Sequence, residues 1–287
     1  MKILKKILKY VIILLSLAFV VLYIIFYRFS TPKSDSKIIA SFTEKNYTPK
    51  IHYLDFDNRS IRVLMSKEKI DPSLPTLLFI HGSIGSSMDF ERYLTDDDLN
   101  KKANLISYDR IGYGQHQKGA VLNSIAKETD LVHTIIQEFN LKNVILLGYS
   151  FGGPIALNYS VNYPLEKLVL CAPAIYGEHE KVPGMINFYK WRLTRFLVPN
   201  VWKSASKEKL SHVADLMKFE NKWHLTQSKK IIGIHGDADW IVPFENSTTL
   251  QKVLPEDKFS LITIKDESHG LVWNSYYLIK RQLMQLL

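Results

Sequence analysis

The chain has 287 residues, 46% of them hydrophobic, with a formal net charge of +9 and a single cysteine. This length fits one large folded domain beside a short terminal segment, and such a domain folds without disulfides, of which one cysteine can form none within the chain. The charge does not indicate nucleic-acid binding, because four lysines precede residue 10 and no arginine-rich strip with interleaved aromatic residues follows.

The first predicted element is an apolar segment, residues 10–28, which follows a basic tail of residues 1–9. No charged residue occurs from Tyr10 to Tyr27, and a helix of this length can span a hydrocarbon core about 30 Å thick. A cleaved signal peptide and a buried helix are the alternatives, but no Ala-x-Ala cleavage site ends the segment. We therefore predict an uncleaved, single-pass membrane anchor.

The lysines predict how this anchor is oriented. Lys2, Lys5, Lys6 and Lys9 precede the apolar segment, and fewer basic residues follow it closely. Because basic residues favour the cytoplasmic side, we expect the N-terminus in the cytoplasm and the folded domain on the extracytoplasmic side.

Residues 29–49 are polar and predict a stalk that joins the anchor to a folded domain of residues 50–287. Two short runs, residues 51–56 and 61–65, predict an antiparallel hairpin that turns at Asp57-Asn58-Arg59. Residues 76–80 predict a buried strand, and residues 124–139 carry apolar side chains at helical spacing.

The most informative motif is Gly148-Tyr149-Ser150-Phe151-Gly152, which lies between a predicted buried strand at residues 143–147 and a predicted helix. A Gly-x-Ser-x-Gly at a strand-to-helix turn is typical of a nucleophilic serine held in a strained backbone conformation. Gly148 and Gly152 stand where a side chain would clash with the turn. The motif predicts that Ser150 is a nucleophile; an ordinary serine in such a turn is the alternative.

A nucleophilic serine needs a base and an acid that orients the base, and both residue types follow in the chain. The predicted strand at residues 230–235 leads into Gly236-Asp237-Ala238-Asp239, and the predicted last strand at residues 258–264 leads toward His269. Serine, acid, histidine is the chain order of one class of serine hydrolases. The acid and the histidine also have plainer interpretations, as a cap of the following turn and as a loop residue.

Four segments together resemble the α/β-hydrolase family, over roughly residue 50 to the C-terminus. They are His81-Gly82-Ser83, Asp109-Arg110-Ile111-Gly112-Tyr113-Gly114, the serine motif at residues 148–153, and Gly236 to Pro243 with Ser268-His269-Gly270. Each segment follows a predicted strand. The resemblance implies an α/β fold with a mostly parallel central sheet, flanked by helices on both faces.

The resemblance also implies roles for individual residues. Ser150 corresponds to the nucleophile, His269 to the general base and Asp239 to the acid, with Asp237 as the alternative acid. The backbone amides of Ser83 and Phe151 correspond to the oxyanion hole. His81 corresponds to a structural residue of the loop that carries Ser83.

The strand pattern stops between residues 175 and 229, a stretch too long for a structureless loop. Because the family often inserts a helical cap above the site at this point, we expect a small cap here. Its aromatic residues either line an acyl or aromatic substrate pocket or pack the cap onto the core. Its basic residues indicate a solvated face more readily than an anion site.

The sequence predicts no cofactor and no metal site, because no His-Glu-x-x-His and no cysteine cluster occurs. A packing or surface role is expected for the other histidines, which are His52, His116, His133, His179, His212, His224 and His235. We predict a membrane-anchored serine hydrolase that acts on a small-molecule ester or related acyl substrate. Peptide, thioester, lactone or carbon–carbon bond cleavage, acyl transfer, and a non-catalytic binding module remain the alternatives.

Overall fold

A computed structural model of the protein describes residues 2–115 and 121–287, so His116 lies outside the described residues. Its centre is a sheet whose described strands lie in the order β1-β2-β4-β3-β5-β6-β7-β8. The strands are β1 (Lys50–Phe56), β2 (Arg59–Met65), β3 (Thr76–Ile80), β4 (Asn104–Tyr108), β5 (Val144–Tyr149), β6 (Leu165–Cys171), β7 (Ser228–Gly236) and β8 (Phe259–Ile264). Strands β4, β3 and β5 to β8 run parallel, and β1 and β2 pair antiparallel at one edge. The predicted fold class is confirmed.

The predicted hairpin forms at the antiparallel edge. Its turn consists of Asp57 and Asn58, whose φ values of 51° and 59° lie in the left-handed region typical of two-residue hairpin turns. Arg59 already pairs with Phe56, so it belongs to β2 and not to the turn.

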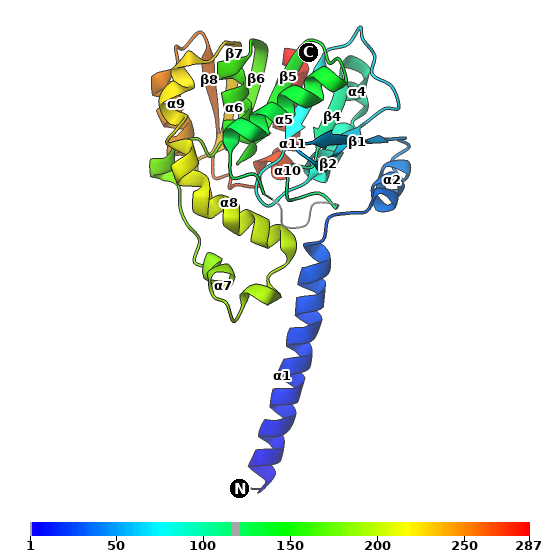
Figure 1. The fold of residues 1–287 in the computed structure, drawn as a ribbon, viewed down its shortest axis with the longest axis vertical. Helices are drawn as coiled ribbons and strands as arrows, with labels where there is room; N and C mark the ends of the chain where they lie inside the picture. The colour runs from blue at the N-terminus through cyan, green and yellow to red at the C-terminus, as the bar shows by residue number, and fades with distance from the viewer. Residues whose placement is uncertain (1, 116–120) are drawn as a thin grey trace.

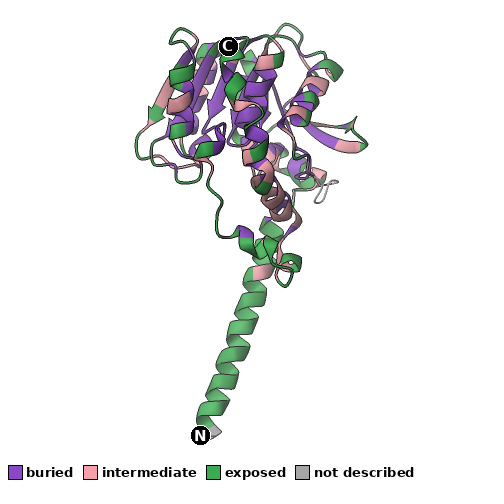
Figure 2. Ribbon diagram, turned by 60° about the vertical axis from the view of Figure 1, so that its left-hand side comes forward, coloured by how far each residue is buried: buried purple, intermediate pink, exposed green. Residues whose placement is uncertain are grey.

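Helices cover both faces of the sheet because successive residues of the central strands are apolar and so present apolar side chains to both faces (Figure 1). In β3, Leu78 and Ile80 pack on one face with α5 and α6, whereas Leu77 and Phe79 pack on the other with α3, α4 and α11. The helices are α3 (Glu91–Leu94), α4 (Asp97–Lys102), α5 (Ile125–Glu138), α6 (Gly152–Asn162), α9 (Glu245–Val253), α10 (Leu271–Asn274) and α11 (Tyr276–Leu286), with the 3₁₀ turn η1 (Ser87–Phe90). Figure 2 shows the resulting buried strands between partly exposed helices.

Residues 29–49 do not form the stalk that the sequence led us to expect. This segment contains α2 (Asp35–Thr43), which packs against the second face of the sheet. Ile38 and Phe42 lie four residues apart, on the same side of the helix, and both side chains are 0% exposed. The polar composition of the segment concealed two apolar residues at helical spacing, and these are enough to seat a short helix on the core.

The N-terminal helix α1 (Lys2–Phe29) extends away from the domain (Figure 1). Residues 3–29 of this helix are long and apolar enough to cross a membrane, and their side chains are exposed over most of that length (Figure 2). The helix begins well before residue 10, so the basic tail is helical where it is described.

The segment between β6 and β7 contains helices and no described strand. They are η2 (Gly177–His179), α7 (Ile186–Lys190), η3 (Arg195–Leu197), α8 (Asn200–Leu216) and η4 (Glu220–Leu225). We call residues 175–227 the cap. In Figure 1, α8 lies across the end of the sheet that faces α1, and α7 hangs beyond it.

Candidate active site

Ser150 stands on the tight turn between β5 and α6. Its φ of 54° is in the left-handed region, which is strained for a residue with a side chain. The turn closes only because its neighbours are small: a Cβ on Gly148 would come within 2.5 Å of the Gly152 carbonyl oxygen, and one on Gly152 within 2.2 Å of the Ile80 carbonyl oxygen. The sequence at this turn therefore holds the Ser150 hydroxyl at the carboxyl end of β5.

His269 and Asp239 lie beside Ser150, although 30 residues separate them from each other and 119 separate His269 from the serine. The Ser150 Oγ is 3.0 Å from His269 Nε2, and His269 Nδ1 is 2.7 Å from Asp239 Oδ2. Parallel strands bring these residues together, because β5, β7 and β8 all end at the same edge of the sheet. In this chain of contacts, His269 can donate from Nδ1 to the carboxylate and accept from the serine at Nε2.

The Asp239 carboxylate is held on both oxygens. Oδ1 accepts hydrogen bonds from the backbone amides of Ile241 and Val242, each at 2.9 Å, while Oδ2 faces His269 and lies 3.3 Å from His235 Nε2. Burial opposes ionisation of this side chain, but the hydrogen bonds from His235 and His269 outweigh it and lower its pKa well below the usual value. Asp239 is therefore ionised at neutral pH.

Asp237, the alternative acid, is not part of this chain of contacts. Its Oδ1 accepts a hydrogen bond from the Asp266 backbone amide at 2.7 Å, at an exposed position. It braces the loop that leads to His269 and has no hydrogen bond to that histidine.

The two backbone amides expected to bind an oxyanion flank the serine. Gly82 packs so closely against Ser150 that a Cβ on Gly82 would lie 2.8 Å from the serine Cβ, and Ser83 follows directly. Phe151 precedes the first residue of α6. In the described part of the chain, neither the Ser83 nor the Phe151 amide donates a hydrogen bond to another protein group. Two unpaired amides beside a serine hydroxyl can bind a developing negative charge.

His81 holds the Ser83 loop from below. Its Nε2 accepts a hydrogen bond from the Arg110 backbone amide at 2.9 Å, and its Nδ1 donates to the Gly82 carbonyl oxygen at 2.7 Å. Burial, followed by the nearby Arg110 guanidinium, holds the pKa of His81 well below its usual value. A neutral ring with one donor and one acceptor fits both contacts.

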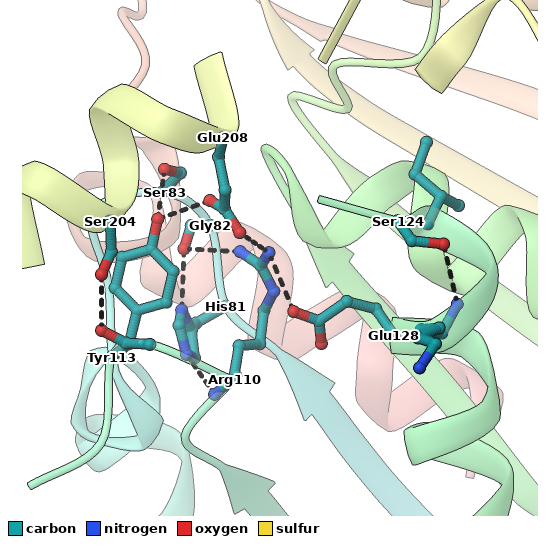
Figure 3. Close-up of polar contacts among 12 residues, drawn as sticks. His81, Gly82, Ser83, Arg110, Tyr113, Ser124, Glu128, Ser204 and Glu208 are labelled. Carbon is teal, nitrogen blue, oxygen red and sulfur yellow. Dashed lines mark hydrogen bonds and ion pairs between the residues drawn. The ribbon is translucent and has the colours of Figure 1, made fainter. Parts of the chain in front are cut away.

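Arg110 links the sheet, the flanking helices and the cap (Figure 3). Its guanidinium is fully buried, 2.5 Å from a Glu208 oxygen on α8 and 3.4 Å from a Glu128 oxygen on α5. One cation faces two buried carboxylates. Burial and the second carboxylate, Glu208, together raise the pKa of Glu128 to about 7 even though Arg110 opposes the rise.

Glu208 also reaches the loop that carries Ser83 (Figure 3). The Tyr113 hydroxyl donates to Glu208, and the Ser83 hydroxyl lies 2.7 Å from the same tyrosine oxygen. Ser204, one turn earlier on α8, donates to the Gly112 carbonyl oxygen at 2.9 Å. The cap helix is thus hydrogen-bonded to the loop that carries Gly112 and Tyr113, and Tyr113 links it to the loop that carries Ser83.

The cap covers Phe151 from above. The ring of His212 on α8 lies 4.3 Å from the Phe151 ring, and its Nε2 contacts the Ala174 carbonyl oxygen. Burial lowers the pKa of His212 to about 3, so the ring is neutral at neutral pH. Glu180, a cap residue with a buried side chain, is paired with Lys209 and lies close enough to His269 for an electrostatic interaction.

Comparison with known proteins identifies the family of this fold. A family model of the alpha/beta hydrolase fold matches residues 75–218, which is half of the chain. The chain belongs to the α/β-hydrolase family. No curated protein matches this α/β-hydrolase in sequence.

Solved structures of other α/β-hydrolases share its fold. A protein proposed to be an aryl esterase, from Burkholderia cenocepacia, aligns with a TM-score of 0.68 and 16% identity over 83% of this chain and 97% of its own. A haloalkane dehalogenase variant from Bradyrhizobium elkanii aligns with a TM-score of 0.63 and 15% identity over 83% and 96%. A membrane phospholipase A aligns with a TM-score of 0.64 and 17% identity over 98% of both chains. These likenesses show the shared fold alone, and a fold does not determine which bond is cleaved.

Several residues of this α/β-hydrolase site were not predicted from the sequence. His235 was expected to be a packing histidine, and it is buried, but it also contacts the Asp239 carboxylate. Glu128 and Glu208 carried no motif at all. Among the described residues, no group of three or more histidine, cysteine, aspartate or glutamate side chains is arranged to hold a metal ion.

Proposed function

We propose that this protein is a serine hydrolase that cleaves a carboxylic ester through Ser150, His269 and Asp239. The observation that carries the proposal is the unbroken series of contacts from the Ser150 hydroxyl through both nitrogens of His269 to the Asp239 carboxylate. The strained backbone of Ser150 supports it, because strain of this kind persists where function requires it.

The proposed reaction has two halves. Ser150 Oγ attacks the acyl carbon while His269 Nε2 takes the hydroxyl proton, and Asp239 stabilises the imidazolium that forms. The imidazolium then protonates the leaving alkoxide, the ester C–O bond breaks, and an acyl-enzyme remains on Ser150. Water attacks this acyl group with His269 as base, which releases the carboxylic acid and restores the serine.

The oxyanion of each tetrahedral intermediate is proposed to bind the Ser83 and Phe151 amides. Removing one such donor typically costs about 3 kcal/mol of transition-state stabilisation. The buried links from Ser83 through Tyr113 to Glu208 support this role, because they fix the loop that carries the Ser83 amide.

Ester hydrolysis is favoured over the other reactions of such a site. A serine at position 150 argues against the dehalogenase and epoxide hydrolase chemistry that uses an aspartate nucleophile. Peptide, thioester, lactone and carbon–carbon bond cleavage use the same groups, and so does acyl transfer, so these reactions are the next to assay.

We further propose that α1 is an uncleaved membrane anchor, with the N-terminus in the cytoplasm and residues 50–287 outside it. The length and hydropathy of residues 3–29 support the anchor, and the lysines at its start support the orientation. The aligned membrane phospholipase A matches 98% of this chain, a share that includes most of α1.

Labelling with a fluorophosphonate probe tests the catalytic proposal. The full chain in detergent is expected to react with the probe, and Ser150→Ala is expected to abolish labelling. Ser73→Ala, on an exposed turn, is the matched control and should label like the parent. A folded parent that does not label would contradict the enzyme and favour a binding module that retains the hydrolase shape.

A further inference from the structure

The C-terminal end of α1 contacts the cap, although more than 170 residues separate the two in sequence. The Tyr23 hydroxyl donates a hydrogen bond to the Leu197 carbonyl oxygen at 3.0 Å. The rings of Phe26 and Trp202 lie 5.4 Å apart, and the Trp202 indole donates to the Ser30 hydroxyl at 2.9 Å. Both views place the cap segment around α7 beside the upper part of α1 (Figures 1 and 2).

These contacts fix the depth of the cap relative to the proposed anchor. A helix rises about 1.5 Å per residue, so the uncharged residues 10–27 are about 27 Å long and nearly match the hydrocarbon core of a bilayer. Tyr23 lies about 6 Å along the helix before Tyr27, within the boundary between hydrocarbon and headgroups. Leu197 lies at the same level, because its carbonyl oxygen contacts the Tyr23 hydroxyl.

The part of the cap that reaches this level is unusually apolar on its outside. We call residues 181–197 the cap tip. Six large apolar side chains of the cap tip are between 51% and 87% exposed: Val182, Met185, Phe188, Trp191, Leu193 and Phe196. A contiguous sequence segment with this many exposed large apolar residues indicates an interaction surface.

The charge of the same segment indicates the partner. The cap tip contains Lys181, Lys190, Arg192 and Arg195 and no acidic residue, and Lys203 and Lys207 follow in the first half of α8, again with no acidic residue up to position 207. Basic residues near an anionic bilayer contribute about 1 kcal/mol each, and tryptophan is favoured at headgroup depth. A basic segment with exposed aromatic side chains therefore fits an anionic lipid surface.

We propose that the cap tip docks on the anionic phospholipid surface that α1 enters. The proposal rests on the anchor proposed above, and it does not depend on the hydrolytic reaction. A second copy of the chain is the other possible occupant, but nothing acidic in residues 181–207 would pair with the basic residues of an identical cap tip.

Nitroxide quenching in proteoliposomes tests the docking. The full chain first receives Ser150→Ala, so that it leaves the lipids intact, and Cys171→Ala, which removes the buried native thiol. Phe188→Cys then provides a single cysteine, which is labelled with NBD. The matched control is Val253→Cys, an exposed apolar position at the end of α9. This position lies near the start of β8, whereas the cap lies at the carboxyl ends of the strands. In vesicles of phosphatidylcholine and phosphatidylglycerol with nitroxide-labelled lipid, we expect quenching several-fold stronger at position 188 than at position 253.

A second pair of substitutions tests the charge argument. Lys190→Glu with Arg192→Glu is expected to reduce quenching at position 188 in vesicles that contain phosphatidylglycerol. Thermal unfolding of each variant in detergent checks that the domain stays folded. Equal quenching at positions 188 and 253 would overturn docking on an anionic surface. Quenching at position 188 that is the same with and without the two charge reversals would overturn it as well.

Three further outcomes separate the possible causes of failure. A blue-shifted but unquenched label, whose shift grows with the protein-to-lipid ratio, would show that a second copy covers the cap tip and would overturn the proposal. Release of the whole chain by alkaline carbonate would overturn the anchor and the docking together. Retention of the chain with an unquenched label would overturn the docking alone.

Discussion

The edge of the sheet that carries the proposed catalytic residues and the cap above it are built in opposite ways. At the sheet edge, each proposed catalytic side chain follows a strand, and its position depends on neighbours close in sequence, such as Gly148 and Gly152 around Ser150. The cap has no strand among its described residues and is held over the site by buried polar contacts with residues about 100 positions away, such as Arg110 with Glu208.

This difference teaches where each kind of change should act. The sheet edge directly positions the atoms proposed to react, so substitutions there should abolish turnover and leave the fold intact. The cap acts through buried charge, so substitutions there should alter the precision of the site and its dependence on pH.

Asp239→Asn should give the largest effect, because the amide cannot stabilise the imidazolium and favours the wrong tautomer of His269. We expect kcat to fall about 10⁴-fold. Steady-state hydrolysis of a soluble ester measures it. Asp237→Asn is the control, since its carboxylate contacts the Asp266 amide and not His269. Equal losses in the two variants would break the assignment of the acid.

Glu208→Gln should give an intermediate effect, because it removes a charge that holds both Arg110 and the Tyr113 hydroxyl. A small displacement of the Ser83 loop can cost up to about 10²-fold in rate, so we expect a 10- to 100-fold lower kcat with a smaller change in KM. Glu178→Gln, on the exposed outside of the cap, is the matched control. An unchanged kcat in Glu208→Gln would mean that the cap does not position the loop.

Glu128→Gln should leave turnover nearly unchanged and alter the pH dependence of stability. The carboxyl ionises near 4.5 in the unfolded chain and near 7 in the folded one, so the folded state binds more protons between these pH values. The stability of the parent should therefore fall as pH rises from about 5 to 7, by on the order of 3 kcal/mol from this group.

The variant should lack that part of the decline, which denaturant unfolding in detergent at several pH values measures. Glu138→Gln, exposed on the same helix, controls for the loss of a charge. Identical slopes in the parent and Glu128→Gln would show that the pKa of Glu128 is not raised on folding.

The sequence predicted the sheet edge better than the rest of the molecule, for a physical reason. A strained turn admits few residue types, so Gly148 and Gly152 predict it from the sequence. A parallel sheet places the ends of its strands along one edge, which brings Ser150, Asp239 and His269 together although they are distant in the chain. The contacts of His235 and Glu208 are tertiary, and no local spacing encodes them. The helix α2 was missed because Ile38 and Phe42 give too short an apolar pattern within a polar segment.

The contact between α1 and the cap has a practical consequence. A chain shortened to begin after α1 would lose Phe26 from the face of Trp202 and leave the Leu197 carbonyl without the Tyr23 hydroxyl. Such a soluble fragment therefore lacks contacts of the cap as well as the first helix. Its substrate preference would be that of a cap without these contacts. Kinetic comparison of the fragment with the intact chain in a bilayer measures how much of the specificity resides in the first helix.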